Sequence, residues 1–200
     1  RYRNMAAQDS VWKEAIKSYF KEFMEFFFAE IAQDIAFEKG YEFLDKELEK
    51  ITQDAEIGKR LADILVKVYL KNGAEMWLLI HIEVQGYVEE GFEKRMYVYN
   101  YRIFDRYGRD VVSLAVLTDA VESFRPSKYE RVYWGFGIKF WFPVVKLIDY
   151  RERWEELERS KNPFAVIVMV CLKEIETRGK VDERLFWKIT LVKRLYEKGY

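Results

Sequence analysis

Two stretches near the middle of the chain alternate apolar and mixed residues with a period of two. They are Ala62–Leu70 and Met76–Gln85. This period is typical of strands that turn one face toward a core. The intervening segment Lys71–Glu75 contains Asn-Gly, which is typical of turns. The sequence therefore predicts a β-hairpin.

The burial pattern also predicts how the two strands are paired. If paired residue numbers sum to 146, Ile64 faces Ile82 and that whole face is apolar. The other face then carries Asp63 opposite Glu83, and opposed Cβ atoms lie about 4.5–5.5 Å apart. A two-residue Asn-Gly turn would give pairs that sum to 145 and would mix the faces. We expect the 146 register, reconciled with the turn by a bulge near Gly73.

Periodicity predicts the remaining elements on either side of this hairpin. Dense Phe residues at helical spacing mark a buried stripe near the N-terminus, and an unbroken apolar run marks a central strand covered on both faces. The apolar run within the helix at 162–178 is ambiguous between helix and strand. We expect helices at Val11–Ile31, Leu44–Gln53, Glu89–Tyr107, Asp149–Arg159, Asn162–Arg178 and Val181–Lys198, and strands at Val111–Leu117 and Arg131–Phe142. We expect core positions, rather than a base-stacking platform, for Tyr133, Trp134, Phe136 and Trp141.

Composition places the chain among globular proteins. It has 200 residues, of which 50% are hydrophobic and 34% charged, enough for a single domain over residues 1–200. No apolar run reaches the ~20 residues that span a bilayer, and the N-terminus lacks a signal-peptide pattern. A single cysteine, Cys171, fits a reducing cytoplasm and, in its apolar run, a core position. We expect a cytoplasmic protein with no membrane partner and, since it starts at Arg1, part of a longer chain.

The formal net charge is zero, with 34 basic and 34 acidic residues. This balance argues against a dedicated basic nucleic-acid coat. A net charge of zero is still compatible with nucleic-acid binding through a local basic patch.

The paired acids carry the candidate chemistry. Acidic residues are disfavoured within strands, and like charges directly opposed in a sheet are destabilising. A divalent cation would hold Asp63 and Glu83 together, and oxygen ligands favour Mg²⁺ or Mn²⁺. The alternative is a pair of solvated carboxylates at the sheet margin.

An Asp followed about twenty residues later by Glu-x-Lys or Glu-x-Gln on the next strand resembles the PD-(D/E)XK nuclease superfamily. Here the motif is Ala62-Asp63, then Glu83-Val84-Gln85. The sequence around the motif resembles one group of this superfamily, the Rpn-like recombination-promoting nucleases, which are often labelled transposases. The stretches that carry this resemblance are RLADILVKVYL, LIHIEVQG, KRMYVYNYRIFDRYGR, FPVVKLIDYRERWEELE and NPFAVIVM, and it covers about residues 12–200.

The resemblance implies an α/β fold, a restriction-endonuclease-like mixed sheet with an αβββαβ core, flanked by helices and extended by further N- and C-terminal helices. It implies metal-dependent hydrolysis of DNA phosphodiester bonds, linked to recombination or mobile elements. Asp63 and Glu83 would bind Mg²⁺ or Mn²⁺, with the Val84 carbonyl as a further ligand, and Gln85 would take the third motif position. Association into a homo-oligomer stays open.

Two departures from the motif bear on activity. Ala62 replaces the Pro, which does no chemistry, and Gln85 replaces the Lys. A neutral amide can orient water but supplies no positive charge near the phosphate. The alternatives to a nuclease are therefore a non-catalytic DNA-binding or protein-interaction module and a purely structural partner domain.

Five further residues are candidates for accessory roles. His81 could bind metal or act as a base, or simply be a partly buried strand residue, and Glu47 could reach the site or belong to a solvated helix face. Lys67 shares a face with Asp63, but four strand residues separate them by roughly 13 Å. Lys94 or Arg95 could stand in for the missing lysine, and Arg95 is otherwise an ordinary helix-surface or stem-packing residue.

Overall fold

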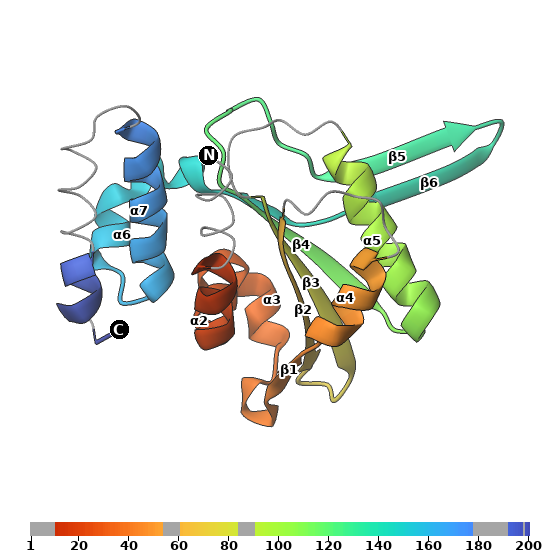
Figure 1. Cartoon of the computed structure of the whole chain (residues 1–200), viewed down its shortest axis with the longest axis horizontal. Helices are drawn as coiled ribbons and strands as arrows, with labels where there is room; N and C mark the ends of the chain where they lie inside the picture. Colours follow the sequence, from red (N-terminus) through yellow and green to blue (C-terminus); the bar gives the residue numbers. More distant parts are fainter. Residues whose placement is uncertain (1–10, 54–60, 84–90, 178–191, 198) are drawn as a thin grey trace.

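Five strands form one mixed sheet at the centre of the computed structural model, which describes residues 11–53, 61–83, 91–177, 192–197 and 199–200 (Figure 1). The sheet order is β1-β2-β3-β4-β7, and its strands are β1 Tyr41–Phe43, β2 Leu61–Tyr69, β3 Glu75–Glu83, β4 Val111–Leu117 and β7 Val144–Lys146. The first three strands are antiparallel neighbours, whereas β3, β4 and β7 run parallel. The expected α/β class with a mixed sheet flanked by helices is confirmed, and the bounds of β4 agree with the expected strand.

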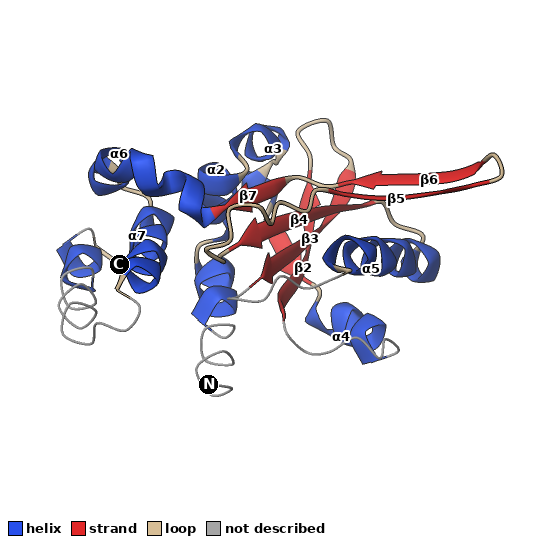
Figure 2. Cartoon of the chain, turned by 90° about the horizontal axis from the view of Figure 1, so that it is seen from above, coloured by secondary structure: helices blue, strands red, loops and turns tan. Residues whose placement is uncertain are grey.

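Helices cover both faces of the sheet (Figure 2). Residues 11–18, α2 Phe20–Phe27 and α3 Ala29–Asp34 lie on one face, and α4 Asp45–Gln53 and α5 Phe92–Tyr107 lie on the other. The C-terminal layer contains η2 Leu147–Arg153, α6 Trp154–Arg159 and α7 Pro163–Glu176, and a short 3₁₀ turn, η1 Phe37–Lys39, precedes β1.

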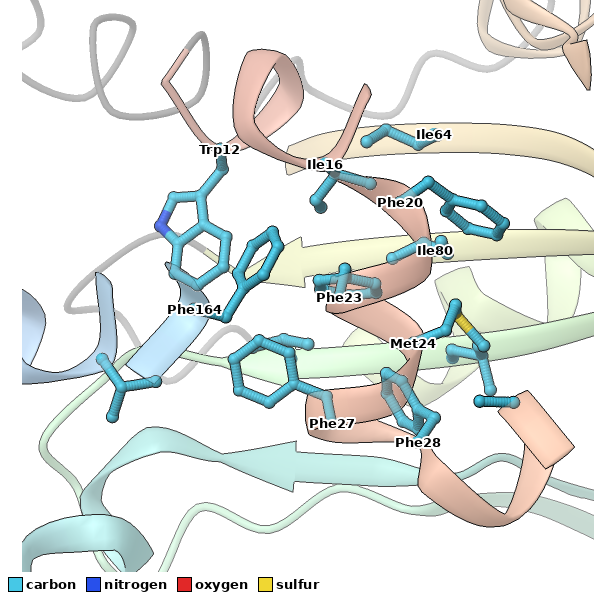
Figure 3. Packing of buried hydrophobic residues seen from close by; sticks show 14 of the residues in the cluster. Trp12, Ile16, Phe20, Phe23, Met24, Phe27, Phe28, Ile64, Ile80 and Phe164 are labelled. Atoms are coloured by element: carbon cyan, nitrogen blue, oxygen red, sulfur yellow. The ribbon is translucent and has the colours of Figure 1, made fainter. Parts of the chain in front are cut away.

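The larger core fills the space between the sheet, the N-terminal helices and α7. Ile64 and Ile80 of the sheet face Phe20 and Phe23 of α2, and Phe164 of α7 packs against the same cluster (Figure 3). The ambiguous run of α7 is helical because it buries side chains around most of its circumference.

The opposite face of the sheet is also buried. Leu65 and Leu79 pack against Tyr99 and Ile103 of α5, and all four side chains are nearly inaccessible. The expectation of one apolar and one mixed, half-open face is therefore wrong for this part of the sheet. Asn100 of α5 also donates to Ser113 Oγ of β4 at 3.1 Å, so the polar residue of that strand is satisfied within the layer.

The β2–β3 register differs from the expected one. Asp63 pairs with His81, and all pairs sum to 144 rather than 146. The turn explains the shift: Leu70 accepts from Gly73 N at 2.9 Å and donates to Ala74 O at 2.8 Å, which makes a three-residue loop. Gly73 has φ +90°, as expected for the bulge residue of such a loop. Because 144 and 146 have the same parity, each residue keeps its predicted face.

Two expected single elements are divided. The helix expected at 11–31 is interrupted at Tyr19 and Phe28, whose backbones leave the helical region. Phe26, Phe27 and Phe28 are consecutive, so one straight helix would turn at least one of them outward. The break lets Phe28 bury its ring as well as Phe27.

The strand expected at 131–142 is a separate hairpin of β5 Lys128–Tyr133 and β6 Phe136–Trp141. Its turn residues Trp134 and Gly135 have φ 48° and 84°, the signs that a two-residue type I′ turn needs. Tryptophan rarely adopts this conformation, so the sequence lacks the usual turn signal. The expected core positions of Tyr133, Trp134, Phe136 and Trp141 are also wrong, since all four side chains are exposed.

The helix expected at 149–159 is likewise divided, into 3₁₀ helix η2 and the short α6. The helix expected at 181–198 is described only over residues 192–197, which are helical. Among the described helices, none has the length and apolar character needed to cross a membrane.

Candidate functional site

The predicted site residues are described to different extents. Asp63 lies in β2 with a described side chain. The backbones of His81 and Glu83 belong to β3, and their side chains lie outside the described residues, as do Val84 and Gln85 entirely. The structure therefore locates one of the predicted metal ligands fully and a second by its strand position.

Asp63 lies where the apolar character of its sheet face ends. Two residues further along β2, Leu65 is fully buried under α5, whereas the Asp63 side chain is half-buried with its Oδ1 atom enclosed. A carboxylate in this position is partly withdrawn from water but not sealed in the core.

The two acid positions are diagonal neighbours. Asp63 pairs with His81, and the Glu83 position pairs with Leu61, so the expected direct opposition of Asp63 and Glu83 is wrong. Diagonal positions of an antiparallel pair lie about 7–8 Å apart, compared with about 5 Å for opposed ones. This spacing lowers the like-charge repulsion of a directly opposed pair.

Helix α5 brings a cation to this face. The C-terminal half of the helix packs on β2 and β3, where Tyr99 and Ile103 contact Leu65 and Leu79. The N-terminal half packs on β4, where Phe92 and Met96 contact Ala115 and Leu117. Ala115 pairs with His81, which pairs with Asp63, so the N-terminal half of α5 lies over the β4 position of the row that contains Asp63.

Arg95 lies in this part of α5 and is only 5% exposed, with its guanidinium 5.5 Å from the Phe92 ring. Its neighbour Lys94 is exposed. Of the interpretations open for Arg95, its burial favours a side chain packed within the fold over one on the open helix surface, where Lys94 lies. A buried guanidinium here places positive charge on the face that holds Asp63.

A buried ion pair lies two strands from the Glu83 position. The Glu83 position pairs with Leu117, which in turn pairs with Lys146 of β7. The Lys146 ammonium donates to Asp119 Oδ1 and Oδ2 at 2.8 and 2.9 Å and to the Phe124 carbonyl at 2.8 Å. Both side chains are 1% exposed.

These contacts use all three donors of the Lys146 ammonium. The pair ties β7 to the segment that follows β4, and Lys146 is not available as a replacement for the motif lysine. Sequence reasoning missed it, although a lysine inside the run Val144–Ile148 and an Asp shortly after an apolar strand were both visible signals.

Lys67 and Glu47 do not join Asp63. Lys67 pairs in register with Trp77 and forms an ion pair with Glu42 Oε2 at 2.6 Å, which raises the pKa of the lysine. The carbonyl oxygen of Glu47 accepts from Tyr107 Oη at 3.3 Å, and the Tyr107 ring lies 5.3 Å from that of Trp77. Glu47 thus belongs to the Trp77 end of the face, roughly 13 Å along the strands from Asp63.

Over the described residues, no group of three or more His, Cys, Asp or Glu side chains is arranged to hold a metal ion. A metal site would therefore consist of Asp63 together with residues whose side chains are not described. Comparison with family models, curated proteins and solved structures gives no match to this chain.

Proposed function

We propose that the chain is a metal-dependent DNA endonuclease. The observation that carries the proposal is the placement of Asp63 in β2: a partly buried carboxylate at a non-core position, diagonal to the Glu83 position on the next strand. A structural role would be served as well by an apolar residue there, as in Leu65 next along the same face.

The residues at this end of the sheet have the ligand chemistry that a divalent ion needs. Asp63 and Glu83 would supply carboxylate oxygens and Val84 a carbonyl, the hard oxygen ligands that Mg²⁺ and Mn²⁺ prefer. Such an ion would supply an activated water and stabilise charge on the scissile phosphate. The chain's own part is to hold Asp63 half-withdrawn from water, to orient water through Gln85 and to provide positive charge from Arg95.

Cleavage of supercoiled plasmid in Mg²⁺ tests this proposal. Asp63→Asn preserves the shape of the side chain and removes its charge, so we expect cleavage to fall by at least about 100-fold, since even outer-sphere partners of metal ligands are worth about 10–100-fold. Mn²⁺ binding, followed by electron paramagnetic resonance, should weaken in parallel.

The matched control is Asp105→Asn, an exposed aspartate on α5. It should cleave and bind Mn²⁺ as the parent does. Parent-like cleavage by a folded Asp63→Asn protein would refute the assignment.

A non-catalytic DNA-binding or interaction module is the second candidate. One observation favours it: the two described lysines on this face, Lys67 and Lys146, are both held by carboxylates, from Glu42 and Asp119. Neither compensates for Gln85. DNA binding that falls with added salt, without cleavage in Mg²⁺ or Mn²⁺, would favour this candidate.

A further inference from the structure

The β5–β6 hairpin is the most exposed aromatic segment of the described chain. In both views it extends past α5, away from α6 and α7 (Figures 1 and 2). Tyr133 is 64% exposed, Phe136 54%, and Trp134 at the turn is fully exposed. Apolar rings this exposed mark a binding surface when they form a contiguous patch.

The strand register sorts the hairpin into two unlike faces. One face carries the opposed pairs Tyr129–Phe140, Arg131–Ile138 and Tyr133–Phe136. The other face carries the pairs Lys128–Trp141, Glu130–Lys139 and Val132–Gly137, so it holds three charged residues and one exposed ring, that of Trp141. Of the five rings on the two strands, four therefore lie on one face and only Trp141 lies on the other.

Helix α5 extends this aromatic face and anchors its inner end. The Tyr97 ring stacks on Tyr129 at 5.1 Å and lies 5.7 Å from Phe140, and on its other side it lies 5.3 Å from Tyr101. Six rings, which we call the aromatic strip, thus follow this face from α5 to the hairpin tip in two groups separated by the Arg131–Ile138 pair. The inner group is Tyr101, Tyr97, Tyr129 and Phe140, and the outer group is Tyr133 and Phe136. Because its inner end is packed, the strip is held in place before anything binds.

Positive charge accompanies the strip. Within residues 128–141 the bases Lys128, Arg131 and Lys139 outnumber the single acid Glu130, although the whole chain has 34 of each kind. The Arg131 guanidinium lies on the aromatic face, 5.5 Å from the Phe136 ring. Exposed rings beside basic side chains are the combination that binds single-stranded nucleic acid, where bases stack on rings and phosphates meet cations.

We propose that the aromatic strip binds single-stranded DNA, a choice of partner that rests on the proposed nuclease function. A duplex conceals its base faces in the stack, so it could not use the rings in this way. A second copy of the chain fits less well, because a two-fold contact through this face would bring the same cation, Arg131, from both copies into one interface. Arg131 would pair with phosphate, and Tyr133 and Phe136 would stack on bases.

The test is the affinity for labelled oligothymidylate, measured by fluorescence anisotropy in EDTA so that no cleavage occurs. Tyr133→Ala/Phe136→Ala should bind roughly tenfold or more weakly than the parent, since each stacked base is worth about 1–3 kcal/mol. Val132→Ala is the matched control, because Val132 is 59% exposed on the opposite face of the same strand. It should bind within about twofold of the parent.

Three results would overturn the proposal: equal binding by the double variant and the parent, tighter binding of a duplex of the same length, or self-association of the parent that the double variant abolishes without changing DNA affinity. The last result would identify the strip as a dimer contact. Asp63→Asn separates the two proposals. It should bind oligothymidylate as the parent does while losing cleavage. If the parent itself fails to cleave but keeps strip-dependent binding, only the nuclease proposal is refuted.

Discussion

At the scale of single residues, Lys146 is a charged side chain that is almost completely buried. Its ammonium and the Asp119 carboxylate are both removed from water and held by three hydrogen bonds. The cost of removing both charges from water offsets much of their attraction, so the pair adds little net stability over an apolar pair. Loss of one partner is different, because it leaves the other charge buried alone.

We expect Lys146→Met to lower the free energy of unfolding by about 3–5 kcal/mol. Adding Asp119→Leu should recover part of that loss, because the second change removes the stranded carboxylate. Urea denaturation measures both. Asp149→Asn, which breaks the exposed Arg125–Asp149 pair, is the comparison and should cost no more than about 1 kcal/mol. Equal effects at the two pairs would contradict this account.

Cys171 gives a pH-dependent prediction at the same scale. Burial in α7 raises the pKa of its thiol to about 12, compared with about 8.5 when unfolded. The neutral thiol is favoured by folding, so this contribution to stability is present below about pH 8.5 and is lost as the pH rises toward 12.

At pH 8 the native thiolate fraction is roughly a thousandfold below that of the unfolded chain. We therefore expect iodoacetamide to label Cys171 about that much more slowly in native protein than in urea. Similar rates in the two states would show that the thiol is accessible and ionised when folded.

At the scale of elements, the start of α7 joins local and long-range contacts in one side chain. Asn162 Oδ1 accepts from Phe164 N at 2.9 Å and caps the helix, while its Nδ2 donates to the Glu22 carbonyl of α2 at 2.8 Å. Pro163 takes the first helical position, where its missing N–H costs nothing. The cap thus sets both where α7 begins and where it docks.

We expect Asn162→Ala to cost about 1–2 kcal/mol of unfolding free energy. Asn162→Asp should cost less, since it keeps the capping oxygen and loses only the donor to Glu22. Lys161→Ala, one residue earlier and exposed, should be neutral in the same urea experiment. If alanine and aspartate at 162 were equally destabilising, the bond to Glu22 rather than the cap would be the important contact.

At the scale of the whole molecule, aromatic packing joins α7 to the N-terminal helices that cover one face of the sheet. The Phe164 ring lies 5.3 Å from Phe23, 5.8 Å from Phe27 and 6.3 Å from Trp12 (Figure 3). Phe164 is more than a hundred positions away from each of these three residues in the sequence. Their packing makes the C-terminal layer part of the same folded unit as α2.

Phe164→Ala should therefore destabilise the whole protein by about 3–5 kcal/mol in a single cooperative transition. Combined with Phe23→Ala, the two losses should be non-additive by about 0.5–1.5 kcal/mol. Phe104→Ala, at a position 55% exposed on α5, is the control and should change stability by less than about 0.5 kcal/mol. A separate early transition in Phe164→Ala would instead mean that α7 unfolds independently.

The candidate site was predictable only in part. Alternation placed Asp63 and the Glu83 position on one face of adjacent strands, and the shared parity of the two registers preserved that relation. Their diagonal offset depends on the three-residue loop closed by Gly73. The burial of Arg95 depends on how α5 crosses the sheet, which periodicity along one helix does not specify.

The sequence by itself determined which residues form β4, α5 and the β2–β3 hairpin, because a strong period of 2 or 3.6 selects a local backbone. Tertiary structure alone decided the register, the covering of the second sheet face, the burial of Lys146 and the exposure of the β5–β6 rings. The physical reason is that a pattern records which side chains share a face, whereas burial depends on which distant segment packs against that face. The outer rings of β5 and β6 are therefore exposed although they are apolar. Lys146 is buried although it is charged, because Asp119 pairs with it.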